Sequence, residues 1–303
     1  MNHFVAESFD EYAHRLALGL ELVDAERGDR VGHPVSVAFD GVPYPLPRSR
    51  APYRAGGYEI TDVLPRVDRH DSGLHALLYA KGLYRPPTPP AQRAFVTLRL
   101  LSPQRRFVPR RLAFPLLDPT PIIAADEANL VAGDPALLGP ARIRRVSLFP
   151  GATYDVSGTA TGLRGRCRRT ADGTPVRWVR VEAWTHDAAG ARIERVGRAQ
   201  GDDRGEFLLL INADASGVGP LDLAAGVSVI VDVHAPPVPG AVPPDVRAAD
   251  PLWDLPVETV TGAGAADPVS LGEAIPAGST LVSRTEAFDL GRCMTSQIAP
   301  FEF

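Results

Sequence analysis

Carboxylates gather in the stretch 198-RAQGDDRGEFLLLI-211, where their spacing could support chemistry. Asp202, Asp203 and Glu206 could bind a metal or act as a catalytic pair. A calcium site needs more oxygen ligands than these three side chains offer at this spacing. Catalytic carboxylates need a cleft and a nearby proton acceptor, and the sequence indicates neither. We therefore interpret the stretch as a turn that starts a buried strand.

Histidines and aspartates also cluster in 68-DRHDSGLH-75, where Asp68, His70, Asp71 and His75 could together bind a metal. We prefer to interpret this cluster as an exposed loop between two strands. The signature motifs of serine hydrolases, zinc peptidases, P-loop nucleotide-binding proteins and dithiol redox proteins are absent. The sequence therefore predicts no catalytic residue, no metal site and no cofactor.

Cys167 and Cys293 lie too far apart in the chain to match a metal-binding spacing. The residues alone leave open whether the two cysteines form a disulfide bond. They also leave open whether side chains of different domains converge on a composite site.

The overall charge argues against a nucleic-acid partner, since the formal net charge is -4 and the pI is about 6.0. We interpret the basic runs 104-QRRFVPRRL-112 and 164-RGRCRRT-170 as a solvated strand face and a hairpin loop. The N-terminus lacks the apolar run of a secretory signal, and no stretch is long and apolar enough to span a membrane. We expect a cytoplasmic protein, or part of a particle released without a signal peptide.

Many short strands are expected, because 30 prolines and 28 glycines punctuate the chain. In 15-RLALGLELV-23 the leucines occupy every second position, which is the period of a strand with one buried face. Similar alternation occurs in 35-VSVAF-39 and 175-PVRWVRVEAWTHD-187, and an apolar run occurs in 205-GEFLLLIN-212. The predicted fold class is all-β.

Two tandem β-sandwich domains are predicted. Both halves follow an alternating strand with a charged turn, Gly-x-Pro-Val and a second alternating strand. The predicted boundaries are an N-terminal β-sandwich over 1–116, a Pro/Gly-rich linker over 117–150, a second β-sandwich over 151–235 and an extended C-terminal arm over 236–303.

The second half resembles the carboxypeptidase regulatory-like domain, in its pattern of V-x-G, then G-x-P-V, then D-x-G-x-F. The matching residues are Val156 and Gly158, then Gly173, Pro175 and Val176, then Asp203, Gly205 and Phe207. Asp202 stands where the family often has threonine, and Trp178 and Val179 replace its usual small residues. The resemblance covers about 80 residues and implies a transthyretin-like or Ig-like sandwich of about seven strands.

The resemblance also implies a role for each residue of the turn. Asp203 should accept hydrogen bonds from its own turn, Gly205 should take a conformation that other residues avoid, and Phe207 should enter the core. Domains of this family are accessory modules in many proteins, and the fold alone does not identify a function. Some occur in gene products of phage tail-like contractile injection systems.

Large aromatic residues are the candidate interaction residues, because such residues anchor protein interfaces. They are Trp178, Trp184, Trp253, Phe301 and Phe303. The favoured function is that of a non-catalytic structural or adaptor protein, with other protein subunits of a larger assembly as its partners. The alternative is a carbohydrate-binding or adhesive module, in which Trp178 and Trp184 form an exposed platform on one strand face that stacks on a glycan.

Overall fold

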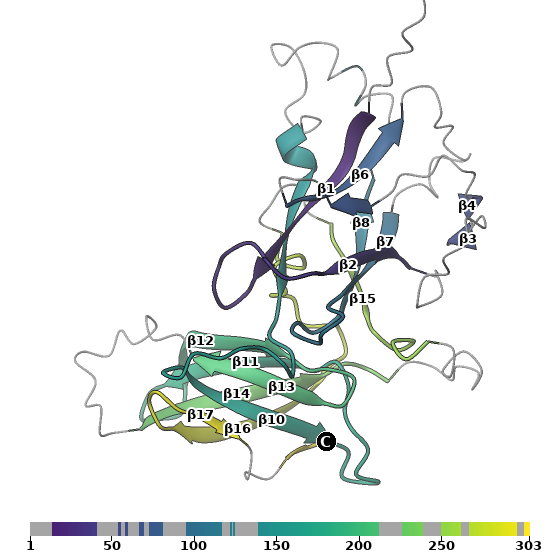
Figure 1. Cartoon of the computed structure of the whole chain (residues 1–303). Helices are drawn as coiled ribbons and strands as arrows, with labels where there is room; N and C mark the ends of the chain where they lie inside the picture. Colours follow the sequence, from purple (N-terminus) through teal and green to yellow (C-terminus); the bar gives the residue numbers. More distant parts are fainter. Residues whose placement is uncertain are drawn as a thin grey trace, which may run out of the picture.

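The protein is all-β, and in the part of the chain that the structure describes, four four-stranded sheets and one two-stranded sheet gather into an upper and a lower lobe (Figure 1). The computed structural model describes residues 14–40, 54–55, 58–59, 67–69, 73–80, 95–116, 122, 124, 139–211, 226–238, 250–261, 267–295 and 300–303. The upper lobe contains β1–β9 and β15, and the lower lobe contains the remaining strands.

Two four-stranded sheets form the upper lobe around one apolar core. The first has the order β5 (Val67–Arg69), β6 (His75–Ala80), β1 (His14–Asp24) and β9 (Ile143–Leu148). The second has the order β15 (Val257–Thr259), β8 (Arg110–Pro115), β7 (Phe95–Leu101) and β2 (Ser36–Phe39). A 3-10 turn, η3 (Gly139–Arg142), precedes β9, and β3 (Arg54–Ala55) pairs with β4 (Tyr58–Glu59).

Two further sheets enclose the core of the lower lobe. One has the order β12 (Arg192–Gln200), β11 (Arg180–His186), β14 (Val227–Ala235) and β16 (Thr280–Phe288). The other has the order β13 (Glu206–Ile211), β10 (Thr161–Arg168) and β17 (Cys293–Thr295), and β18 (Phe301–Glu302) also pairs with β10. The architecture is therefore of the β-sandwich type.

The alternation predicted for β1 is confirmed from Leu18 to Leu22, but not before it, where Leu16 is half-buried and Ala17, at 4% exposure, lies in the core. Leu18, Leu20 and Leu22 are each at most 5% exposed and lie in the upper core. On the opposite face, the carboxylate of Glu21 pairs with Arg30 and Arg145. An irregularity in the pairing of β1 with β6 falls between Leu16 and Leu18.

Strand β13 joins the two cores, because both of its faces are apolar. Phe207 and Leu209 point into the lower core, whereas Leu208 and Leu210 belong to the upper core. A strand buried on both faces reads as a continuous apolar run, which explains the sequence FLLLI. Burial of a leucine contributes roughly 1.5–3 kcal/mol, so this strand binds the lobes tightly together.

Two predicted boundaries are wrong. Residues 143–148 of the expected linker form β9, which pairs in parallel with β1 from Gly19 to Asp24. Part of the expected C-terminal arm forms β15 to β18, and β16 pairs with β14 along its full length. The lobes are therefore not successive segments of the chain. After β14 the chain returns to the upper lobe as β15 and then re-enters the lower lobe as β16.

Residues 153–160, which include the V-x-G element of the family resemblance, do not form a strand. This segment consists of turns and irregular backbone, and the adjacent strand is β10 at Thr161–Arg168. In β10 the side chains of Leu163 and Cys167 face the core, while the arginines between and after them face away from it. The basic run 164–170, expected to form a hairpin loop, thus lies mainly on a strand face.

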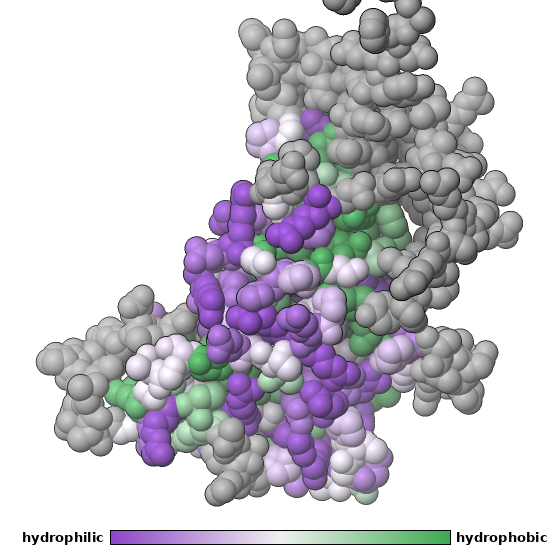
Figure 2. Space-filling model, viewed as in Figure 1, coloured by the Kyte–Doolittle hydropathy of each residue, from purple (hydrophilic) through white to green (hydrophobic). Residues whose placement is uncertain are grey.

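On the face shown in Figure 2, coloured residues over the lower lobe and its junction with the upper lobe are mainly hydrophilic. Hydrophobic residues gather over the part of the upper lobe where β2, β7 and β8 lie in Figure 1. All four residues of β2 are half-buried, in keeping with its position at the edge of a sheet.

Candidate functional site at the junction of the lobes

Residues 250–260, here called the strap, connect both lobes. From the upper lobe, Arg99 Nη1 pairs with Asp250 Oδ2 at 2.7 Å, and Arg111 Nη1 donates to the carbonyl oxygen of Leu255 at 3.3 Å. From the lower lobe, Trp178 Nε1 donates to Asp254 Oδ1 at 2.8 Å. The strap is thus fixed by charged or hydrogen-bonded contacts on both sides.

A buried cluster of three charges lies where the strap becomes β15. Arg110 of β8, at 0% exposure, binds Glu258 of β15 through two hydrogen bonds, Nε–Oε1 at 3.0 Å and Nη2–Oε2 at 2.8 Å. Arg180 of β11 approaches the same carboxylate, with Nη2 at 3.1 Å from Oε1. One carboxylate of the upper lobe therefore pairs with an arginine from each lobe.

The two arginines of this cluster differ in how well their N–H groups are satisfied. Arg110 also donates to the carbonyl oxygens of Ser147, Val269 and Ser270 at 2.5–2.8 Å, so each of its nitrogens has a partner. In Arg180, by contrast, Nε is buried without a hydrogen-bond partner. The cluster carries one excess positive charge, and Arg180 is its weaker member.

The electrostatics of the cluster favour the ionised carboxylate. Burial alone would raise the pKa of Glu258, but the charges of Arg110 and Arg180 and their hydrogen bonds hold it below its ordinary value. Burial lowers the pKa of Arg180, partly offset by the attraction of Glu258. A charge-assisted, two-pronged contact of this kind fixes geometry as well as adding energy, so the cluster sets the relative position of β8, β11 and β15.

The turn at 202–206 is structural, and one detail of its prediction needs correction. Asp202, not Asp203, accepts the hydrogen bonds within the turn, from the backbone N–H groups of Arg204 at 2.8 Å and Glu206 at 3.0 Å. Asp202 has this role because two- and four-residue offsets place those N–H groups around its carboxylate. Asp203 lies on the other side of the turn and pairs with Arg105 of the upper lobe at 3.3 Å.

The other two turn residues take the positions that the family resemblance implies. Gly205 has φ of 70°, and a Cβ there would lie 2.7 Å from the carbonyl oxygen of Cys167. Phe207 is 4% exposed in the lower core, with its ring centroid 5.8 Å from that of Phe301.

The two tryptophans expected on one strand face do not form an exposed platform. Trp178 precedes β11, has φ of 62° and is only 2% exposed, so the alternation of the strand does not extend to it. Trp184 is half-buried on β11, with the guanidinium of Arg195 5.9 Å from its ring. Trp178 thus packs inside the protein, whereas Trp184 is only partly covered.

The other candidate interaction residues lie in the strap and in the lower lobe. Trp253 is half-buried in the strap. Phe301 is 2% exposed in the lower core, where the guanidinium of Arg284 lies 4.0 Å from its ring centroid. Phe303 is partly buried against the same core, and its backbone bonds to that of Arg168 and Thr170. Of the candidates, the phenylalanines thus serve the packing of the lower lobe.

The cysteines are both free thiols. Cys293 stands in register with Gly162 on β10, five residues from Cys167 on the same strand, which corresponds to roughly 16 Å. This separation exceeds what a disulfide can bridge.

The cluster at 68–75 is only partly placed. Asp68 and His75 lie on the neighbouring strands β5 and β6, whereas His70 and Asp71 fall outside the described residues. His75 is buried, and burial together with the charge of Arg69 lowers its pKa. Within the part of the chain that the structure describes, no group of three or more histidine, cysteine or acidic side chains is placed to hold a metal ion.

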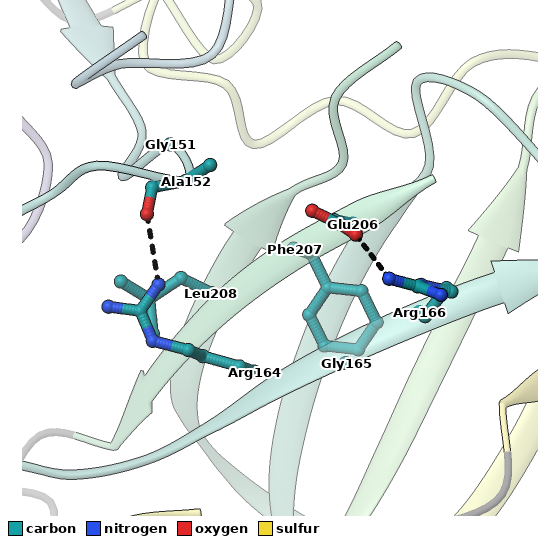
Figure 3. Close-up of a pocket in the computed structure, with 8 residues that line it drawn as sticks. All are labelled: Gly151, Ala152, Arg164, Gly165, Arg166, Glu206, Phe207 and Leu208. Carbon is teal, nitrogen blue, oxygen red and sulfur yellow. Dashed lines mark hydrogen bonds and ion pairs between the residues drawn. The ribbon is translucent and has the colours of Figure 1, made fainter. Parts of the chain in front are cut away.

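Small pockets border the lobe junction among the residues that the structure describes. The first, of about 270 Å³, lies between residues 151–152 and strands β10 and β13 (Figure 3). The second, of about 160 Å³, lies between the segment 99–109, the turn at 202–203 and the start of the strap. The third, of about 170 Å³, contains Glu26, Arg195 and Arg198. Burial and the charge of Asp24 raise the pKa of Glu26 to about 8.

Sequence reasoning missed the residues that join the lobes. Arg180 lies within the alternating stretch 175–187, but nothing in the sequence around Glu258 indicates a buried carboxylate. The signal that could have found it is the isolated acidic residue between Val257 and Val260 in a short apolar segment.

Comparisons with known proteins identify no family. No protein-family model matches the chain, and no curated protein matches it. A solved structure that matches is a 9R-lipoxygenase from Cyanothece PCC8801, at 10% identity and a TM-score of 0.22, over 51% of this chain and 18% of that chain. The chain thus spans less than a fifth of the lipoxygenase, and this likeness supports no conclusion about fold or activity.

Among the described residues, no helix is long and apolar enough to cross a membrane.

Proposed function

We propose that this protein is a non-catalytic structural or adaptor component of a larger multiprotein assembly. The observation that carries the proposal is the way in which the strap and the buried cluster of Arg110, Glu258 and Arg180 join the two lobes. A component that transmits position between partners needs such fixed geometry, and buried ion pairs with two-pronged contacts provide it.

The use of the acidic residues supports the same proposal. Asp202 binds the backbone of its turn, Asp203 pairs with Arg105, and Glu206 pairs with Arg166 at 2.5 Å. A catalytic carboxylate would instead face a cleft, next to a group that takes or gives a proton. The carboxylates of 202–206 therefore act in the fold and in joining the lobes.

The proposal has two narrower parts. The first places the protein in the cytoplasm, or in a particle released without a signal peptide, with other protein subunits as its partners and neither nucleic acid nor a cofactor bound. The second assigns the assembly to a phage tail-like contractile injection system. This second part rests on the resemblance of residues 153–235 to the carboxypeptidase regulatory-like domain.

Affinity purification from the native organism at low salt, followed by mass spectrometry, tests the proposal. A tagged full-length chain should recover a fixed set of proteins, and tagging one of those proteins should recover this chain in return. A strain that expresses the tag alone is the control. Recovery of the chain without stoichiometric partners would contradict the assembly role, and a glycan array would then test the carbohydrate-binding alternative.

A further inference from the structure

The first junction pocket carries an unbalanced positive charge. Its walls come from residues 151–152 of the upper lobe and from strands β10 and β13 of the lower lobe. Arg164 and Arg166 border it, and Glu206 is its acidic residue (Figure 3). Phe207 and Leu208 contribute an apolar surface beside these charges.

The charge of Arg166 is already compensated, but that of Arg164 is not. Arg166 Nη2 donates to Glu206 Oε1 at 2.5 Å. Arg164 Nη1 donates to the carbonyl oxygen of Ala152 at 3.2 Å, and its guanidinium also contacts the thiol of Cys293. No carboxylate of the described residues pairs with Arg164. A guanidinium has five N–H donors, so Arg164 retains donors for a further acceptor.

Arg164 is the arginine of this pocket that can take a further anionic group. Arg164 and Arg166 are two residues apart on β10 and therefore lie on the same face of the strand. Their guanidinium groups point to different sides of the pocket (Figure 3), and the planar guanidinium of Arg164 matches the geometry of a carboxylate.

We infer that this pocket binds a carboxylate-bearing ligand, with Arg164 as its main anchor. The pocket volume of about 270 Å³ exceeds what a bare inorganic ion fills and accommodates a short acidic chain. The carboxylate can come from a small organic acid or from an acidic side chain of a protein partner. The inference is independent of the proposed assembly role, because a free acid would occupy the same pocket.

Binding to the full-length chain tests the inference with two probes at low salt, where charge interactions are least screened. Glutarate represents a free acid, and fluorescein-labelled tetraglutamate represents a protein-borne carboxylate. Glutaramide and tetraglutamine are their uncharged counterparts. Calorimetry measures the first pair, and fluorescence polarisation measures the second.

Three variants separate anchoring from folding. Arg164→Gln should weaken binding by about tenfold or more, as expected when a charge-assisted hydrogen bond is lost. Arg168→Gln is the matched control, since Arg168 is exposed on the same face of β10 but outside the pocket. Glu206→Gln should tighten binding, because it removes the competing carboxylate and releases Arg166. A structural role for Arg164 alone would not predict that gain.

Each outcome has a definite meaning. Loss of binding in Arg164→Gln, with retention in Arg168→Gln and a gain in Glu206→Gln, supports the inference. Binding of glutarate alone would identify a free acid as the ligand class, and binding of tetraglutamate alone would identify a protein-borne group. Equal binding by Arg164→Gln and the wild type, equal binding of the uncharged probes, or no binding of either acidic probe would overturn it.

Discussion

The buried carboxylate of Glu258 gives the sharpest prediction, and Glu258→Gln is the substitution that tests it. Glutamine keeps the size of the side chain but removes its charge. Glu258 receives contacts at 2.8, 3.0 and 3.1 Å from Arg110 and Arg180, which are 0% and 5% exposed. The variant therefore leaves two buried guanidinium groups without a counter-charge.

Removing one partner from a buried ion pair typically costs about 3–5 kcal/mol, because the remaining charge is left desolvated and unpaired. Domains are usually stable by only about 5–15 kcal/mol. Glu258→Gln should therefore lower the free energy of unfolding by about 3–5 kcal/mol. Urea-induced unfolding followed by tryptophan fluorescence measures this value, and Trp178 beside the strap should report on the junction.

The matched control is Asp289→Asn, which breaks an exposed pair with Arg292 whose side chains are 64% and 76% exposed. Exposed pairs contribute about 0–1 kcal/mol, so this variant should be nearly as stable as the wild type. A loss below about 1 kcal/mol for Glu258→Gln would refute the reasoning.

The same substitution predicts a pH dependence. The folded pKa of Glu258 lies below its ordinary value of 4.5, so its contribution to stability is fully present above that value. It is lost as the pH falls through the folded pKa. The stability difference between wild type and Glu258→Gln should thus be constant near neutral pH and shrink in acid.

Three further predictions concern the junction and the turn. Arg110→Met should destabilise the protein more than Arg180→Met in urea unfolding, because every nitrogen of Arg110 has a partner whereas Nε of Arg180 has none. Equal losses of unfolding free energy in the two variants would contradict the larger role of Arg110. Asp202→Asn should lower the melting temperature by an amount equivalent to about 1–3 kcal/mol, because it weakens the hydrogen bonds that a buried carboxylate accepts from the turn. Asp203→Asn should cost less than about 1 kcal/mol, because it breaks only an exposed ion pair with Arg105. A larger loss for Asp203→Asn than for Asp202→Asn would contradict the role assigned to Asp202. The pKa of Glu26 is raised to about 8, so between its ordinary pKa of 4.5 and pH 8 the folded state binds a proton that the unfolded state does not, and stability should fall as the pH rises through that range. In thermal unfolding at a series of pH values, Glu26→Gln should reduce this dependence of the melting temperature on pH. An unchanged dependence would contradict the role of Glu26.

The all-β class could be predicted from the sequence because local alternation determines which face of a strand is buried. Leu18, Leu20 and Leu22 illustrate this, since each enters the core at the expected period. Strand β16 shows where the method fails. Its core-facing positions include Arg284 and Glu286, which pair with each other, so its apolar alternation is interrupted. Charged side chains inside a sheet hide the strand from a pattern based on hydrophobicity.

The junction could not be predicted, because it depends on contacts between segments far apart in the chain. Arg110 and Glu258 are separated by 148 residues, and neither has a local pattern that identifies its partner. Trp178 failed for a different reason. Its positive φ takes it out of the strand period, and a sequence pattern assigns every residue an ordinary backbone. The pairing of the lobes was therefore beyond what periodicity can show.

The most direct test of the assembly role is the size of the native protein. Sucrose-gradient sedimentation of a gentle lysate from the native organism, with the untagged chain detected by antibody, measures this size. The proposed function predicts that the chain sediments with a particle much larger than its own 32.4 kDa and shifts to that mass when the particle is dissociated. Sedimentation of all of the protein as a free 32.4 kDa chain would contradict it.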